Sequence, residues 1–155
     1  MMIRRFEESD AEAVSQLIRT TMEISNRKDY PEEMMDDLIR SETPEHVLGQ
    51  AGWTHMYVVA DGEKIIGCGA IGPYWGKKDE SSLFSFFVLP EYQGKGIGRK
   101  IMETLEQDEY FLRAKRIEIP ASITGLPFYL RMGYHYKNGI TEPDEQLLYR
   151  LEKNR

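Results

Sequence analysis

The chain has 155 residues, of which 41% are hydrophobic and 30% are charged, and its 20 basic and 26 acidic residues leave a net charge of −6. This length suits one domain, residues 1–155, with one sizeable core. An acidic balance argues against a general nucleic-acid-binding or anionic-membrane-binding surface, because both reward a basic face. The single cysteine, Cys68, excludes an internal disulfide and a cysteine metal cluster. Without a signal-peptide pattern or an apolar run near the roughly 20 residues of a membrane span, a cytoplasmic protein is expected.

The first third of the sequence predicts one short strand followed by helices. Residues 2–6 form the strand, and Ser9 with Glu12 makes a capping-box pattern at the start of the first helix. Pro31 is expected at the first position of a second helix, where the missing N–H costs least. A third, shorter helical piece follows Thr43.

A hairpin is predicted next. Residues 54–60 and 65–75 read as two strands joined by Asp61-Gly62, a strong two-residue turn signal. The second strand contains a G-x-G-x-x-G pattern from Gly67 to Gly72. A dinucleotide-binding fingerprint must open a helix within a strand-helix-strand unit, which a hairpin cannot provide. Nucleotide binding is therefore the weakest of the three functions that the sequence leaves open; the other two depend on the segments described below.

The segment from Leu83 to Arg99 organises the rest of the chain. Residues 83–89 predict a strand buried on both faces, which Pro90 ends. A helix is expected from near Gly94 to about Phe111, with three glycines in its first turns. Bare amides at a helix start suit a phosphate or pyrophosphate, and Lys95, Arg99 and Lys100 would add positive charge. The alternative is a glycine-rich turn that packs tightly on a neighbouring strand.

The last third predicts a return to the sheet. Residues 116–119 form a fifth strand, too far along the chain for a hairpin and so parallel to the fourth. A short helix then runs through Tyr129 and ends at Gly133, and strands at 134–137 and 147–151 complete the chain. The sequence therefore predicts one α/β domain with a mixed sheet.

Two segments carry a resemblance to a known family. Residues Gln93-Gly94-Lys95-Gly96-Ile97-Gly98 resemble the Gln/Arg-x-x-Gly-x-Gly/Ala signature of the GCN5-related N-acetyltransferase (GNAT) superfamily. Residues 128–134 are similar to the Phe-Tyr-x-x-x-Gly-Phe/Tyr motif that follows the fifth strand of that family. The resemblance implies a GNAT-like acyl-coenzyme A N-acyltransferase fold. In that fold about seven strands are flanked by about four helices, and strands four and five are parallel and splayed.

The resemblance also implies a binding site for acetyl-coenzyme A. The pantetheine would lie along the fourth strand and bond the main chain of Phe86, Phe87 and Val88. The pyrophosphate would be held by a turn consisting of Gln93, Gly94, Lys95, Gly96, Ile97, Gly98 and Arg99. Ser122 replaces an asparagine that often contacts the cofactor in the family, and Gly125 stands where alanine is usual.

Tyr129 falls on the tyrosine that many members use as general acid toward the departing thiolate, although its pattern alone also fits a core aromatic residue. A phenol pKa near 10 and a thiol pKa near 8.5 are close enough for proton transfer. The resemblance does not identify the general base, because Ser82 stands at the position where some members have a catalytic glutamate. A water chain, Glu80, Glu118 or His55 are candidates.

The function implied is transfer of an acetyl group from acetyl-coenzyme A to a primary amine, by direct attack in a ternary complex. The acceptor is a small molecule or a peptide of unspecified identity, which Tyr30, Tyr74 and Trp75 could face, and a homodimer is compatible with the sequence. The alternative is a non-catalytic acyl-coenzyme A-binding or regulatory module. The three histidines lack metal-ligand spacing, so no metal is expected, and buried Cys68 is expected to be inert.

Overall fold

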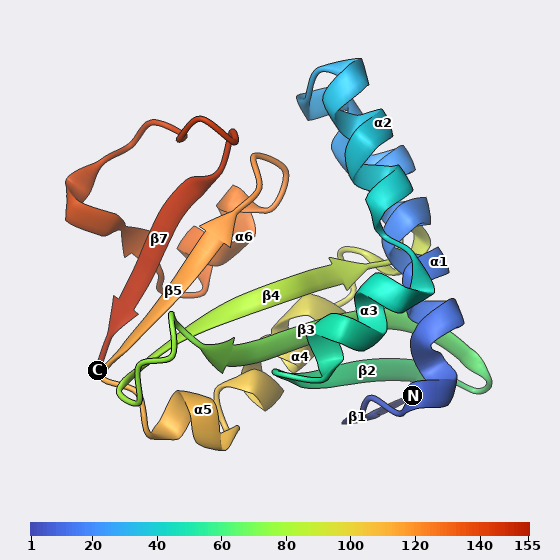
Figure 1. Cartoon of the computed structure of the whole chain (residues 1–155), viewed down its shortest axis with the longest axis horizontal. Coiled ribbons are helices and arrows are strands. Elements are labelled where there is room, and N and C mark those ends of the chain that lie inside the picture. The colour runs from blue at the N-terminus through green and yellow to red at the C-terminus, as the bar shows by residue number, and fades with distance from the viewer.

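The computed structural model describes residues 1–155, and its centre is a mixed sheet of seven strands in the order β1-β2-β3-β4-β5-β7-β6 (Figure 1). The strands are β1 (Met2–Arg5), β2 (His55–Asp61), β3 (Lys64–Pro73), β4 (Glu80–Val88), β5 (Arg116–Ala121), β6 (His135–Tyr136) and β7 (Tyr149–Asn154). The helices are α1 (Ala11–Thr21), α2 (Glu32–Ser41), α3 (Pro44–Ala51), α4 (Ile97–Leu105), α5 (Glu109–Leu112) and α6 (Leu126–Arg131). The predicted α/β class and seven strands are confirmed, with six helices rather than about four.

The sheet has one parallel pair of strands. β4 runs antiparallel to β3 and parallel to β5, as predicted, and β7 lies between β5 and β6. Figure 1 shows that β5 and β7 diverge from β4, and that the separation grows toward the C-terminal end of β4. This divergence divides the sheet into a larger part, β1 to β4, and a smaller part, β5 to β7.

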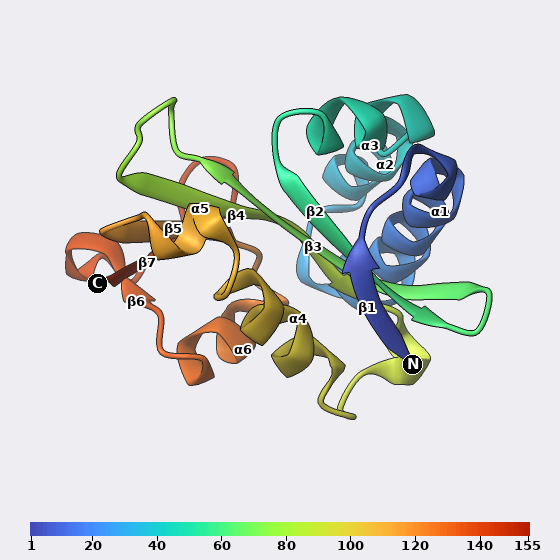
Figure 2. The same cartoon turned by 90° about the horizontal axis from the view of Figure 1, so that it is seen from below.

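The helices cover both faces of the larger part of the sheet. α1, α2 and α3 lie on one face and α4 lies on the other (Figure 2). A Cβ at Gly69 would lie 2.7 Å from Cγ2 of Ile101 on α4, so β3 needs glycine for this close packing. The G-x-G-x-x-G pattern from Gly67 to Gly72 lies inside β3 and opens no helix. The dinucleotide-binding reading of this pattern is therefore wrong.

Two N-terminal helix starts differ from prediction. The capping box is formed by Glu7 and Asp10, and the Asp10 carboxylate accepts the Glu7 N–H at 2.8 Å. Ser9 lies in the 3-10 turn between them, so the predicted Ser9–Glu12 box is wrong. The two capping patterns overlap in the sequence, and Arg4 favours the one with Asp10 because it pairs with the Asp10 carboxylate at 2.8 Å. Pro31 directly precedes α2 instead of occupying its first position.

From β3 onward, the bounds of several elements also differ from the prediction. The second hairpin strand ends at Pro73, and the fourth strand begins at Glu80 rather than Leu83. The predicted helix from Gly94 to Phe111 is two helices, α4 and α5, because the Asp108 side chain accepts the Tyr110 N–H and caps a new start. β5 continues two residues beyond the predicted end, and β6 and β7 are shifted by one to three residues at their ends.

The core is a cluster of 28 buried residues that joins both helical layers to the sheet. α4 contributes its buried side to it through Ile97, Ile101, Met102 and Leu105. Tyr129 belongs to the same cluster, so α6 is held against the sheet beside α4. None of the helices is long and apolar enough to cross a membrane.

Candidate active site

The site begins where β4 and β5 separate. Their register includes three pairs, Glu80 with Arg116, Ser81 with Ile117, and Ser82 with Glu118. Beyond Ser82, β4 stays paired to β3 as far as Val88, but it has no partner on the β5 side. The residues from Phe84 to Val88 are consequently half-buried, so the prediction of burial on both faces is wrong for this part of the strand. Backbone groups on this open side are available to an extended ligand.

A bulge marks the open half of β4. Ser85 has a φ of +48°, and the pairing of β4 with β3 shifts register between Cys68 and Ala70. The Cys68 thiol donates a hydrogen bond to the Ser85 carbonyl at 3.1 Å, and the Ser85 hydroxyl contacts Oε1 of Gln50 on α3. Bulges redirect a strand and often adjoin functional sites. Here Ser85 turns its side chain toward α3, between Phe84 and the candidate pantetheine-binding residues.

The glycine-rich turn leads from β4 into α4. Gly94 and Gly96 have φ of +75° and +83°, and Gly96 is the N-cap of α4. These two glycines therefore precede the helix, because the left-handed conformation that they adopt is strained for other residues. Gly96 offers no side chain to cap the amides of the first turn, which have no partner within the helix and lie at the positive end of its dipole. An anion can bind there.

The other predicted residues of this turn have different roles. Lys95 and Arg99 are exposed, and Nζ of Lys95 lies 5.6 Å from the centre of the Tyr92 ring. The Ile97 side chain is buried in the core, so this residue could contact a ligand only through its main chain. The Gln93 side chain donates to the Val88 carbonyl at 2.9 Å and thereby holds the turn against the end of β4.

The opening has two arms, which are β4 with the glycine-rich turn on one side and β5 with α6 on the other. Tyr129 lies on the second arm, in α6. It is buried, and its ring packs edge-on against Phe86 of β4 and Phe128, with centroids 5.7 and 5.5 Å away. Burial raises the pKa of the Tyr129 phenol, with a smaller contribution from Cys68, so the phenol stays protonated at neutral pH. The structure thus brings the predicted acid next to the predicted pantetheine strand.

Ser122 and Gly125 shape the support of Tyr129. Oγ of Ser122 accepts the Gly125 N–H at 2.9 Å and so stabilises the turn into α6. A Cβ at Gly125 would lie 2.9 Å from Cε2 of Tyr129. The departure from the family alanine therefore makes room for the Tyr129 ring in its present position.

One segment connects the two arms of the opening. After the π-helix Met22–Asn26 and the 3-10 turn Arg27–Asp29, the Tyr30 hydroxyl accepts the N–H of Ile123 at 2.7 Å. Asp29 accepts the hydroxyl of Thr124 at 2.6 Å, and on the other arm Gln93 donates to Ser25 at 3.2 Å. The sequence pointed to Tyr30 but missed Ser25, Asp29 and Thr124, because contacts across 68 to 95 residues leave no local pattern.

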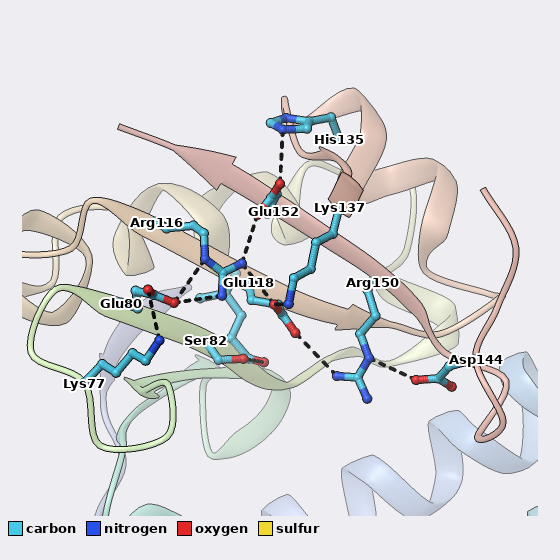
Figure 3. A network of polar contacts seen from close by, with 11 residues as sticks. Lys77, Glu80, Ser82, Arg116, Glu118, His135, Lys137, Asp144, Arg150 and Glu152 are labelled. Atoms are coloured by element: carbon cyan, nitrogen blue, oxygen red, sulfur yellow. Dashed lines mark hydrogen bonds and ion pairs between the residues drawn. The ribbon is translucent and has the colours of Figure 1, made fainter. Parts of the chain in front are cut away.

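Glu118 occupies the narrow end of the opening and is 1% exposed. Its Oε1 accepts from Arg116 at 2.9 Å and from Lys137 at 2.8 Å, and Arg150 lies 3.6 Å from its Oε2 (Figure 3). Arg116 also pairs with Glu80 at 2.9 Å. The network therefore balances buried charge with hydrogen bonds from several strands.

The base candidates named from the sequence are engaged elsewhere. Glu80 and Glu118 pair with cations in this network. His55 Nδ1 lies 2.9 Å from the buried carboxylate of Asp108, beside α5 and away from the opening. Two aromatic residues were expected from the sequence to face an acceptor. The guanidinium carbon of Arg116 lies 4.9 Å from the centre of the Tyr74 ring, and Trp75 is 84% exposed.

The comparisons with known proteins agree with this geometry. A model of the GNAT acetyltransferase domain matches residues 52–136. A PaiA N-acetyltransferase from Thermoplasma acidophilum, solved with coenzyme A, has 18% identity and a TM-score of 0.83 over 99% of this chain and 98% of its own. A GCN5-related N-acetyltransferase from Rhodopseudomonas palustris has 17% identity and a TM-score of 0.76, over 99% and 95% of the two chains. A GNAT-family acetyltransferase from Staphylococcus aureus has 15% identity and a TM-score of 0.72, over 99% and 98%.

No curated protein matches the sequence. The solved structures are too distant in sequence to show more than the shared fold. The domain match is stronger evidence of family, since it includes all of β2 to β5, the glycine-rich turn and Tyr129. The chain is therefore an acyltransferase that belongs to the GNAT acetyltransferase family.

Proposed function

We propose that the protein transfers the acetyl group of acetyl-coenzyme A to a primary amine of a small molecule or peptide, by direct attack in a ternary complex. The observation that supports this proposal is that β4 and β5 separate after Ser82, so that β4 has a free edge, leads into the glycine-rich turn before α4 and packs through Phe86 against Tyr129. An extended pantetheine can bond the free edge as an added strand would. The pyrophosphate then reaches the amides at the start of α4.

In this mechanism the acceptor nitrogen attacks the thioester carbonyl carbon, and the C–S bond breaks after the C–N bond has formed. The main chain near Val88 would donate to the carbonyl oxygen while negative charge develops on it. Tyr129 would give its proton to the departing thiolate, and the nitrogen would return a proton to the phenolate through solvent. Phe86 and Phe128 hold the phenol in place and exclude water from its ring.

Ser122 has a supporting place in this proposal. Its hydroxyl oxygen accepts the Gly125 N–H, and a hydroxyl that accepts in this way can still donate its own proton to the cofactor. Phe86, Phe87 and Val88 would act through their main chain, as would Gly94, Ile97 and Gly98. Lys95 and Arg99 supply exposed positive charge beside the phosphates.

A binding measurement and a screen test the proposal. Calorimetry with coenzyme A measures cofactor binding, and a panel of amines, amino acids and peptides is then incubated with acetyl-coenzyme A while free thiol is detected. We expect binding and protein-dependent thiol release with at least one amine, with the acetylated product confirmed by mass. Binding without acetylation of any amine would instead favour the acyl-coenzyme A-binding module. Absence of coenzyme A binding at millimolar ligand would refute both.

A further inference from the structure

The bulge in β4 is held by two hydrogen bonds to Ser85. This residue adopts the left-handed conformation, which is strained for a residue with a side chain and persists only where neighbouring groups fix it. Its carbonyl accepts the Cys68 thiol of β3 at 3.1 Å, and its hydroxyl donates to Oε1 of Gln50 on α3. One contact thus comes from the neighbouring strand and the other from the helix that covers it.

The bulge determines how the main chain runs along the opening. Two residues of β4, Ser85 and Phe86, lie opposite the single residue Gly69 of β3. An extra residue of this kind bends its strand and changes where the following main-chain groups point. Phe86 is the first of the residues whose main chain is proposed to bond the pantetheine, and its ring centre lies 5.7 Å from that of Tyr129. The conformation of Ser85 therefore acts directly on the direction of the amides at the proposed site.

Gln50 belongs to a well-fixed part of the fold. It is half-buried in the last turn of α3, and its own carbonyl accepts the Thr54 hydroxyl at 2.8 Å. A Cβ at Gly72 of β3 would lie 2.9 Å from Cγ2 of Thr54, so the end of α3 packs closely on β3. Trp53 packs edge-on against Phe84 of β4, with ring centroids 4.9 Å apart. Because this end of α3 is anchored on both strands, the Gln50 amide holds a fixed place beside the bulge.

We propose that Gln50 is a positioning residue for acetyl transfer, an inference that rests on the proposed function. By accepting the Ser85 hydroxyl it fixes the bulge, so that the main-chain amides of residues 86–88 already point at the thioester carbonyl oxygen when acetyl-coenzyme A binds. Donors aimed in advance at developing negative charge accelerate acyl transfer, whereas a displacement of about 1 Å can cost about 10²-fold in rate. Gln50 acts through Ser85 and takes no part in proton transfer.

The carbonyl stretching frequency of bound acetyl-coenzyme A tests this role without an acceptor. Infrared difference spectra are recorded with the cofactor isotope-labelled at the acetyl carbonyl. A hydrogen bond to the carbonyl oxygen lowers its frequency, so the cofactor bound to the parent protein should absorb at a lower frequency than free cofactor. Gln50→Leu keeps the size of the side chain but removes the hydrogen-bond acceptor, and most of this shift should disappear. Gln50→Glu retains an oxygen that accepts the Ser85 hydroxyl and should preserve the shift.

Two further variants complete the set. Ser85→Ala removes one oxygen from the other side of the same contact, so it should lose the shift as Gln50→Leu does, and it decides the question if Gln50→Leu does not fold. The double variant should lose no more than either single variant, because both break one contact. Gln16→Leu makes the same chemical change on the exposed side of α1 and should behave as the parent does.

Binding, stability and turnover are measured on the same variants. Coenzyme A has no acetyl group, so its affinity by calorimetry should not change. With an acceptor from the amine panel, Gln50→Leu should lower kcat by about 10- to 10²-fold and leave the KM for acetyl-coenzyme A nearly unchanged. Gln50→Glu should restore most of this loss.

The outcomes separate the role of Gln50 from the proposed function. A lower unfolding midpoint of Gln50→Leu with an undiminished carbonyl shift would show that the contact only holds α3 on the sheet, and would overturn the inference alone. Loss of the shift in Gln50→Glu as well would also overturn it, because the acceptor oxygen would then not be the cause. If the parent protein binds acetyl-coenzyme A without any carbonyl shift, the proposed main-chain donor fails together with Gln50. If it does not bind the cofactor, the proposed function itself fails.

Discussion

Ser82 of β4 and Glu118 of β5 are the last residues that pair the two parallel strands, and they fix the point at which the sheet opens. Their side chains differ in what they can contribute. Ser82 is the residue that the family resemblance relates to a catalytic glutamate of some members, and it is buried. Glu118 carries the carboxylate at the neighbouring position, but Arg116 and Lys137 already occupy its Oε1. The ion pairs of Glu118 thus support the two arms of the opening at the end where β4 and β5 are still paired.

The first prediction tests this support. Glu118→Gln keeps the size of the side chain but leaves Arg116 and Lys137 without their shared charge partner. Breaking a buried ion pair typically costs about 3–5 kcal/mol, so urea unfolding should show a loss of that order. Glu63→Gln, an exposed acid in the β2–β3 turn, should change the free energy of unfolding by no more than about 0.5 kcal/mol. Similar small changes in both variants would mean that the network does not stabilise the fold.

The second prediction concerns pH and the N-terminal cap. Hydrogen bonds from Arg4 hold the pKa of Asp10 below its ordinary value, despite opposing desolvation. Because the folded-state pKa is lowered, the stabilisation is complete above the pH where an unfolded aspartate titrates, about pH 4, and disappears as pH falls through the folded pKa. Asp10→Asn should therefore cost about 1.5–3 kcal/mol at pH 7 and progressively less in acid.

Glu12→Gln is the control for that prediction, because Glu12 belongs to the capping pattern that the structure does not use. Thermal unfolding of both variants from neutral pH to pH 3 separates the two caps. A larger effect of Glu12→Gln, or an effect of Asp10→Asn that does not depend on pH, would contradict the assignment.

The sequence predicted features that depend on neighbouring residues and missed those that depend on distant ones. The apolar run before Pro90, the turn at Gly94 to Gly98 and the Tyr129 motif are local patterns, and in the structure β4 precedes that turn and Phe86 of β4 packs against Tyr129. The contact of Tyr30 with Ile123 joins residues 93 positions apart, so no local pattern contains it.

The third prediction separates backbone strain from ligand binding. Gly96 and Gly62 both have positive φ, +83° and +64°, and neither has an atom within 4 Å of an added Cβ. Alanine at either position should cost about 1–2 kcal/mol of stability, because the left-handed conformation is strained. Only Gly96→Ala should also weaken coenzyme A binding, by about tenfold or 1.4 kcal/mol, as measured by calorimetry. Equal affinities in the two variants would exclude the turn before α4 as the phosphate site.

The fourth prediction is that Tyr129→Phe lowers turnover and preserves coenzyme A affinity. The substitution removes one hydroxyl and keeps the ring that packs against Phe86 and Phe128. General acid catalysis contributes about 10²–10⁴-fold, so kcat with any acceptor found in the screen should fall within that range if thiolate departure limits the rate.

The matched control for Tyr129→Phe is Tyr134→Phe. Tyr134 is also buried, but its hydroxyl faces the sulfur of Met102 at 3.9 Å, so its removal should affect stability more than turnover. Burial raises the pKa of both phenols, which stay protonated at neutral pH, and this excludes a difference in charge as the cause of any contrast. Single-turnover measurements isolate the chemical step when product release limits kcat. Full single-turnover activity of Tyr129→Phe would show that solvent, and not Tyr129, protonates the thiolate.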